Sequence, residues 1–217
     1  MEYPGPMPTG ASSRALLLLP AALRAGLVLG CAAAAGCTSV DDLVPIVAPT
    51  RACAPTREET VTCTIDGDTV DFGGCTGDAS EQVRLLGIDA PETEKANTPA
   101  ECFADEATEF TRLHLDGRQV RLEFDALCVD IYDRNLAWIL LEGDETDPLY
   151  DVLVDLGGLG IQEGSGNFEV IFSEVLARGG YADVYEYEPD VRYYDQIELA
   201  VEAAKAEGRG MWGSCGD

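Results

Sequence analysis

Short stretches of alternating hydrophobic and polar residues recur between residues 58 and 141. Val61, Cys63 and Ile65 alternate with threonines, which is the period-two pattern of a strand with one buried face. The Asp66-Gly67 pair that follows predicts a turn. On the same grounds we expect four further strands, at residues 70–72, 82–88, 120–124 and 136–141.

Apolar residues at helical spacing predict three helices. The first covers residues 99–115 and ends at Asp116-Gly117. The second begins after Asn167, which can cap it, and ends at Gly179-Gly180. The third covers residues 195–207.

Residues 142–166 do not fit this pattern and are interpreted as an insertion. Their ends are rich in Asp, Glu and Gly, and we expect the apolar run at 149–156 to form an extra strand or hairpin. The remaining order has one helix after the third strand and two helices at the end. It predicts an α+β fold, namely a five-stranded OB-type Greek-key β-barrel with three helices.

The first 37 residues have the character of a targeting signal. They end in Ala34-Ala35-Gly36-Cys37, and small residues before a cysteine resemble a bacterial lipoprotein signal. We therefore expect Cys37 to be lipidated. The protein would then be a lipoprotein of the cell envelope, anchored in the outer membrane, and secretion is the alternative. Cleavage before Cys31 and ordinary signal-peptidase cleavage nearby are the alternatives. Pro20 and Arg24 interrupt the apolar run, which argues against a membrane-spanning anchor.

The segment after the signal has a different composition. Residues 38–57 contain acidic residues and prolines with little periodicity, which predicts a flexible tether. A folded domain at residues 58–217 follows, and we expect it to be a monomer.

The chain is strongly acidic, with 40 Asp and Glu against 14 Lys and Arg and a formal net charge of -26. Such a charge argues against a broad surface for binding polyanions. Any contact with nucleic acid must therefore be local or assisted by a metal ion.

Eight cysteines fit an exported chain with disulfides. If Cys37 carries lipid, Cys31 leaves with the signal and six cysteines remain. We expect a cross-strand bridge between Cys63 and Cys75. Position alone suggests the other two pairs, which are Cys102 with Cys128 and Cys53 with Cys215. The chain has no Cys-x-x-Cys pair and one histidine, His114 at a helix end, so a structural zinc site is disfavoured.

Two aspartates follow turns or strands that approach the same end of the predicted sheet. Asp68 and Asp89, together with a backbone carbonyl, have the oxygen ligands that suit calcium. Taken alone, the Asp66-Gly67-Asp68 sequence would be interpreted as a structural turn. Arg84 changes this interpretation, because an arginine in an apolar strand needs a phosphate or a carboxylate as its partner.

Two further residues complete a candidate site for phosphodiester chemistry. Glu92, three residues after Asp89, could orient or deprotonate a water molecule. Arg134 comes from another loop and could hold the phosphate from the other side.

From residue 61 to residue 212 the chain resembles a staphylococcal nuclease-like (thermonuclease) domain. The resemblance rests on segments that occur in the same order, at residues 65–70, 83–93, 106–107, 130–137, 173–182 and 210–212. It implies an OB-type fold and a calcium-dependent endonuclease that hydrolyses DNA and RNA and leaves 3'-phosphates.

The resemblance also implies a role for each site residue. Calcium would be held by Asp68, Asp89 and the backbone carbonyl of Ala90. The catalytic residues would be Arg84, Glu92 and Arg134. The nucleotide would be bound by Tyr132, Tyr185 and Tyr187, whose rings can stack on any base. For Tyr185 and Tyr187, surface or core packing is an equal alternative.

Some positions depart from the family pattern. Asp133 stands where the family usually has glycine, and its carboxylate could pair with Arg134 or repel phosphate. Ile131 and Glu188 stand where basic residues often flank the site. We therefore expect short or single-stranded nucleic acid to be preferred over long duplexes. The alternative is a nuclease-like binding or scaffold module on the cell surface with weak catalysis, but the presence of all three catalytic residues favours an enzyme.

Overall fold

The computed structural model describes residues 53–96 and 98–216. The predicted signal with Cys31 and Cys37, and the predicted tether up to residue 52, lie outside the described residues. The strands are β1 Arg57–Thr60, β2 Cys63–Asp66, β3 Thr69–Asp71, β4 Gln82–Leu85, β5 Ile88–Asp89, β6 Gln119–Glu123, β7 Asn135–Gly143, β8 Phe168–Ile171 and β9 Asp183–Val184. The helices are the 3-10 helix η2 Ala79–Glu81 and the α-helices α1 Ala104–Leu115, α2 Pro148–Asp155, α3 Phe172–Gly179, α4 Tyr194–Glu207 and α5 Met211–Ser214.

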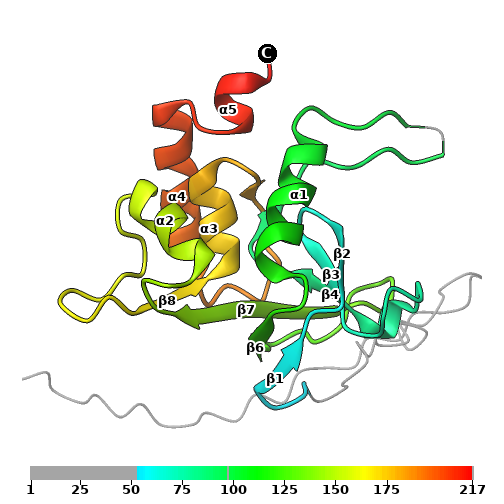
Figure 1. Ribbon diagram of the computed structural model, residues 1–217. Helices are drawn as coiled ribbons and strands as arrows, with labels where there is room; N and C mark the ends of the chain where they lie inside the picture. The colour runs from blue at the N-terminus through cyan, green and yellow to red at the C-terminus, as the bar shows by residue number, and fades with distance from the viewer. Residues whose placement is uncertain (1–52, 97, 217) are drawn as a thin grey trace, which may run out of the picture. The chain divides into compact units, whose positions relative to one another are not determined.

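Seven of the described strands form a mixed sheet. Its order is β1-β6-β7-β4-β3-β2, and β8 pairs with β7. Strands β4 and β7 run parallel, whereas the other pairs in this sheet are antiparallel. Helices α2, α3 and α4 gather over β7 and β8, and α1 packs against β2 (Figure 1). The protein is therefore an α+β fold with helices on a mixed sheet.

Strands β1 and β2 lie at opposite edges of this sheet, although only Val61 and Thr62 separate them in the chain. The Val61 amide donates to the Arg118 carbonyl beside β6 (3.0 Å), and the Thr62 amide donates to the Asp71 carbonyl in β3 (2.8 Å). The chain thus passes from one edge to the other at these two residues. No pairing among the described strands closes the sheet, so the OB-type barrel stays a prediction.

Gly87 divides the stretch that was predicted as one strand at 82–88. Its φ of +82° lies in the left-handed region, and a Cβ there would come within 2.5 Å of Ile197 and 2.8 Å of Trp138. Strand β4 therefore ends before it, and β5 turns to pair with β9 instead. This turn directs Asp89 toward the candidate site.

The prediction of a strand or hairpin at 149–156 is wrong, because this part of the insertion is helix α2. The Asp147 side chain accepts a hydrogen bond from the Leu149 amide (2.8 Å), and Pro148 occupies the first turn. Leu149 and Leu153, four residues apart, are buried. The apolar run therefore follows a helical period.

The second predicted helix begins later than expected. Residues 168–171 form β8, whose Ile171 pairs with Leu140 of β7. Helix α3 begins at Phe172, which is fully buried. Strand β1 was not predicted, because its sequence Arg-Glu-Glu-Thr lacks apolar residues.

The first predicted helix also begins later, at Ala104 rather than residue 99. Phe103 has a φ of +74°, which lies in the left-handed region and ends the preceding loop.

No helix of the described residues is both long enough and apolar enough to cross a membrane.

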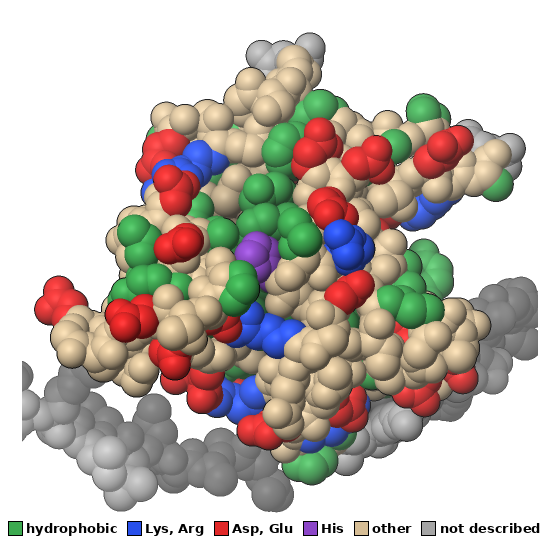
Figure 2. Space-filling view, in the orientation of Figure 1, with side chains coloured by type: hydrophobic (Ala, Val, Ile, Leu, Met, Phe, Trp, Pro, Cys, Tyr) green, Lys and Arg blue, Asp and Glu red, His purple; other side chains and the backbone are tan. Residues whose placement is uncertain are grey.

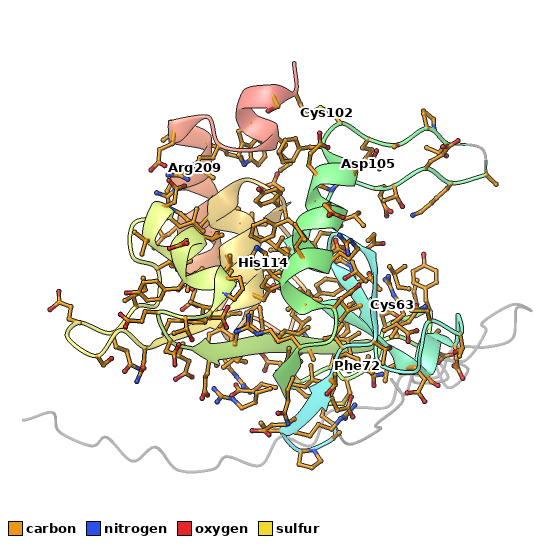
Figure 3. The ribbon with its side chains drawn as sticks, viewed as in Figure 1. Cys63, Phe72, Cys102, Asp105, His114 and Arg209 are labelled. Carbon is orange, nitrogen blue, oxygen red and sulfur yellow. A yellow bond between two sulfur atoms is a disulfide. The ribbon has the colours of Figure 1, made fainter. Side chains whose placement is uncertain are left out.

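The structure pairs six cysteines, and the Cys63–Cys75 bridge is confirmed. The other two predicted pairs are wrong. Cys53 bonds to Cys128 and Cys102 bonds to Cys215, with Cα–Cα distances of 5.0 and 5.9 Å. Cys53 precedes β1, which lies beside β6 and thus near the loop that holds Cys128. Cys102 precedes α1 where the C-terminal helix α5 ends (Figure 3).

Candidate active site

The turn between β2 and β3 brings Asp68 into the body of the protein. A Cβ on Gly67 would lie 2.6 Å from the Ala90 Cβ and 3.0 Å from the Ala107 Cβ, so only glycine permits this close approach. Thr111 of α1 donates a hydrogen bond to the Gly67 carbonyl (2.7 Å). Asp68 is consequently buried, and its Oδ2 accepts from the Ala90 amide (2.7 Å).

Arg84 links the two predicted calcium-binding carboxylates. Its Nη1 lies 2.9 Å from Asp68 Oδ2 and its Nη2 lies 2.7 Å from Asp89 Oδ1. Nη1 also donates to the carbonyls of Leu85 (3.1 Å) and Ile88 (2.9 Å). The buried arginine thus has the carboxylate partners that its place in an apolar strand required.

The charges of this cluster are incompletely balanced. The pKa of Asp68 is raised to about 7, mainly by burial; Arg84 acts in the opposite direction, and Asp66 contributes a smaller increase. The pKa of Asp89 is also raised by burial and lowered by Arg84, while its side chain remains 57% exposed. An additional cation would therefore stabilise the two charged carboxylates.

Arg134 is oriented by a turn that begins at Asp130. The Asp130 carboxylate accepts from the Tyr132 amide (2.8 Å), the Arg134 amide (3.0 Å) and Arg134 Nε (2.7 Å). Asp133 has a φ of +66°, which explains why glycine suits this position. Among the described residues, Asp130 rather than Asp133 forms the ion pair with Arg134.

Thr69 connects Arg134 to the Asp68 carboxylate. Arg134 Nη1 donates to Thr69 Oγ1 (3.3 Å), which in turn donates to Asp68 Oδ1 (3.1 Å). Arg84 therefore approaches this carboxylate from β4, and Arg134 approaches it from the loop before β7. The structure brings these two predicted catalytic residues together.

Glu92 lies in the segment between β5 and α1, which forms a loop that projects from the body of the protein (Figure 1). Its Oε2 is 2.6 Å from Lys95 Nζ, and its amide donates to Glu101 Oε2 (2.9 Å). Both side chains of the Glu92–Lys95 pair are at least half exposed. Glu92 is nevertheless close enough to raise the pKa of Asp89 by charge repulsion, although burial is the larger cause.

The three predicted nucleotide-binding tyrosines lie beside the arginines or beside one another. Arg84 Cζ is 5.8 Å from the centre of the Tyr187 ring, which is 4.6 Å from the Tyr185 ring. Arg134 Cζ is 5.5 Å from the Tyr132 ring. Burial is the main cause that raises the pKa of Tyr187. Tyr132 and Tyr185 are exposed and offer ring surface to a ligand.

Three residues that touch the site were missed from the sequence, namely Thr69, Lys95 and Asp130. Asp130 could have been found, because an aspartate side chain in a turn commonly accepts a hydrogen bond from the backbone amide two residues later, here that of Tyr132. Thr69 and Lys95 carry no such signal, since their partners depend on how the strands and the loop fold.

Comparison with known proteins supports the resemblance to a staphylococcal nuclease-like domain. Residues 82–214 match the family described as "Staphylococcal nuclease homologue". The thermonucleases of Staphylococcus hyicus and Staphylococcus intermedius are 34% and 35% identical to the chain over 150 residues, which are 68% of this chain and 71% of each relative. Endonuclease YncB of Bacillus subtilis (strain 168) is 28% identical over 155 residues, covering 70% of this chain and 60% of that protein. The chain belongs to the family of staphylococcal nuclease homologues.

Proposed function

We propose that the protein is a calcium-dependent endonuclease that hydrolyses DNA and RNA and leaves 3'-phosphates. The observation that carries the proposal is the buried Arg84 guanidinium, which joins Asp68 to Asp89 close to Arg134. Relatives named thermonuclease and endonuclease support phosphodiester hydrolysis as the reaction.

The chemistry of the donor set fits calcium. Asp68, Asp89 and the Ala90 carbonyl would hold the ion, and all three supply oxygen, which calcium prefers. No three His, Cys, Asp or Glu side chains cluster for a metal within residues 53–96 and 98–216, so water and substrate oxygens would complete the shell. Bound calcium would neutralise the phosphate charge and polarise its oxygens.

The side chains of the protein would divide the remaining tasks. Arg84 and Arg134 would donate hydrogen bonds to the phosphate oxygens and stabilise the charge that builds up on them. Asp130 keeps the Arg134 guanidinium oriented for this. Glu92 would accept a proton from the attacking water, which requires it to leave Lys95.

The surface chemistry favours short or single-stranded substrates. Acidic side chains are spread over the face shown in Figure 2, and duplex affinity depends mainly on basic contacts with phosphates. Ile131 is 90% exposed beside Tyr132, so the rim of the site offers apolar and aromatic contacts instead. Faster cleavage of duplex than of single strands at every salt concentration would contradict this preference.

We also propose that the protein is exported and anchored through lipid on Cys37. The three disulfides support an oxidising compartment. Mass spectrometry of the mature N-terminus tests this proposal, and an unmodified residue at that end would contradict it.

One observation supports a second candidate function, a binding module with weak catalysis. Glu92 and Arg134 are each paired with an opposite charge of the protein itself, Lys95 and Asp130. Such pairing would have to be loosened or shared during turnover.

A nuclease assay decides between the two functions. The purified full chain is incubated with a labelled single-stranded oligonucleotide and calcium, and product ends are checked for 3'-phosphate. We expect Glu92→Gln to lower kcat by roughly 10²- to 10⁴-fold, the usual effect of losing a general base. Glu94→Gln, an exposed neighbour in the same loop, is the control and should leave the rate unchanged. Activity that survives both a calcium chelator and Glu92→Gln would reject the proposal.

A further inference from the structure

The loop that carries Glu92 is not held by the core. Between Glu92 and Glu101 its described side chains are exposed or half-exposed. Its backbone pairs with itself, since the Glu101 amide donates to the Glu92 carbonyl (2.9 Å) and Lys95 and Thr98 exchange two hydrogen bonds of 3.0 Å. These local bonds shape the loop but do not place Glu92 relative to Arg84.

The two ends of this loop are anchored by different means. At the near end, the buried Ala90 donates its amide to Asp68. At the far end, Cys102 directly follows the paired Glu101 and is bonded to Cys215 (Figure 3). Cys215 follows α5, which is itself held to the end of α3 by a hydrogen bond from the Met211 amide to the Gly180 carbonyl (2.9 Å).

The loop that carries Arg134 has a similar anchor. Cys128 is bonded to Cys53, and its carbonyl accepts from the Leu136 amide (2.9 Å). Thus the two loops that supply Glu92 and Arg134 each have a disulfide at their base.

The third disulfide differs and provides a matched control. Cys63 lies opposite Asp71 in the β2–β3 ladder, at the end away from the Gly67 turn. Asp68, which lies between the two cysteines, is already fixed by this ladder and by its buried contacts. Loss of the Cys63–Cys75 bond should therefore leave the site in place.

We infer that the Cys102–Cys215 disulfide is a positioning device for Glu92, so that efficient cleavage requires the oxidised chain. This inference rests on the proposed function. Without the bond, the far end of the loop is held only through the start of α1, where Ala104 is buried and its amide donates to the Glu101 carbonyl (3.2 Å), and Glu92 no longer keeps a fixed distance from the phosphate. A misplacement of about 1 Å can cost roughly a hundredfold in rate.

The covalent step is a thiol–disulfide exchange. Cys102 and Cys215 together give up two protons and two electrons to a disulfide oxidant, which is reduced to two thiols. A chain in a reducing compartment would accordingly have a low kcat and would gain activity when it is oxidised. An endonuclease of this kind would spare the nucleic acids of the cell that makes it.

Paired substitutions in the full chain test the inference. Cys102→Ser with Cys215→Ser is compared with Cys63→Ser with Cys75→Ser, at a temperature where circular dichroism shows both to be folded. With calcium and a single-stranded oligonucleotide, the first pair should lower kcat by roughly ten- to a hundredfold and change KM by less than about twofold. The second pair should lower Tm but leave kcat unchanged.

Two outcomes would overturn the inference, namely an unchanged kcat in the Cys102/Cys215 variant or equal losses of kcat in both variants. Hydrogen exchange gives a readout that does not depend on activity. The amides of Thr98 and Glu101 should exchange faster in the Cys102/Cys215 variant only, and equal exchange in all forms would also overturn it. If the unmodified chain has no nuclease activity, the proposed function fails, whereas the exchange result still decides whether the disulfide holds the loop.

Discussion

The two parts of the candidate site are held in contrasting ways. Arg84, Asp68 and Asp89 form a centre in which the arginine and Asp68 are buried and each contact comes from a strand or its end. Glu92 lies on an exposed loop, paired with the still more exposed Lys95. Under the proposed function, this difference would separate two tasks. A phosphate-binding centre gains from fixed charges in a region of low dielectric constant, whereas a group that accepts a proton has to reach water.

The largest expected effect follows from removal of the buried arginine, which tests whether buried charge stabilises this centre. Arg84→Ala leaves Asp68 buried without its partner, and we expect a loss of about 3–5 kcal/mol in the free energy of unfolding. Urea denaturation measures it. Arg112→Ala, which breaks the exposed pair with Glu109, is the control and should change stability little. Similar losses in the two variants would show that the Arg84 centre is not held by buried charge.

A smaller effect is expected when the exposed pair is broken. Lys95→Ala frees Glu92 from an ion pair worth about 0.2–1 kcal/mol, so kcat should rise by at most about fivefold. The free energy of unfolding should fall by no more than about 1 kcal/mol. Steady-state kinetics with calcium measure the effect, and Lys205→Ala, at an exposed pair with Asp183, is the control. A fall in kcat would mean that Lys95 acts on the substrate itself.

An effect of similar size is expected in the loop of Arg134, whose side chain is 22% exposed and thus intermediate between Arg84 and Glu92. Asp133→Gly removes the strain of a left-handed conformation and should raise the free energy of unfolding by about 1 kcal/mol. Asp133→Ala removes the same charge but keeps the strain, so it should give no such gain. If both variants were equally stable, charge rather than backbone conformation would govern this turn.

The Arg84 centre could be predicted from sequence because its signals are local. An arginine within an apolar strand and aspartates after a turn and a strand each carry a physical requirement that the fold then satisfies. The partner of Arg134 was not predicted, because Asp133 is adjacent in sequence while Asp130 is placed correctly by the turn.

The mistaken assignments have two causes, namely a local helix cap at 147–148 and tertiary contacts in the other cases. An apolar run such as 149–156 fits a strand or a helix equally well, and the cap at Asp147 with Pro148 decides for the helix. The stretch at 168–171 has helical spacing but pairs with β7. The pairing of Cys102 with Cys215 depends on where the end of the chain packs, and the local sequence around either cysteine does not predict that position.

The position of β1 has a consequence for how the chain is made. Strand β1 pairs with β6, in which Leu122 lies opposite Arg57. This pairing can form only after much of the domain has left the ribosome. Until β6 is synthesised, the backbone N–H and C=O groups of β1 have no strand partner and can pair with other chains. The sequence of β1 begins Arg-Glu-Glu, and this lack of apolar residues is the reason why its pattern did not predict a strand. Charged side chains on an exposed strand also disfavour pairing with other chains. We therefore expect the same residues that make this strand hard to recognise to lower the tendency of the nascent chain to aggregate.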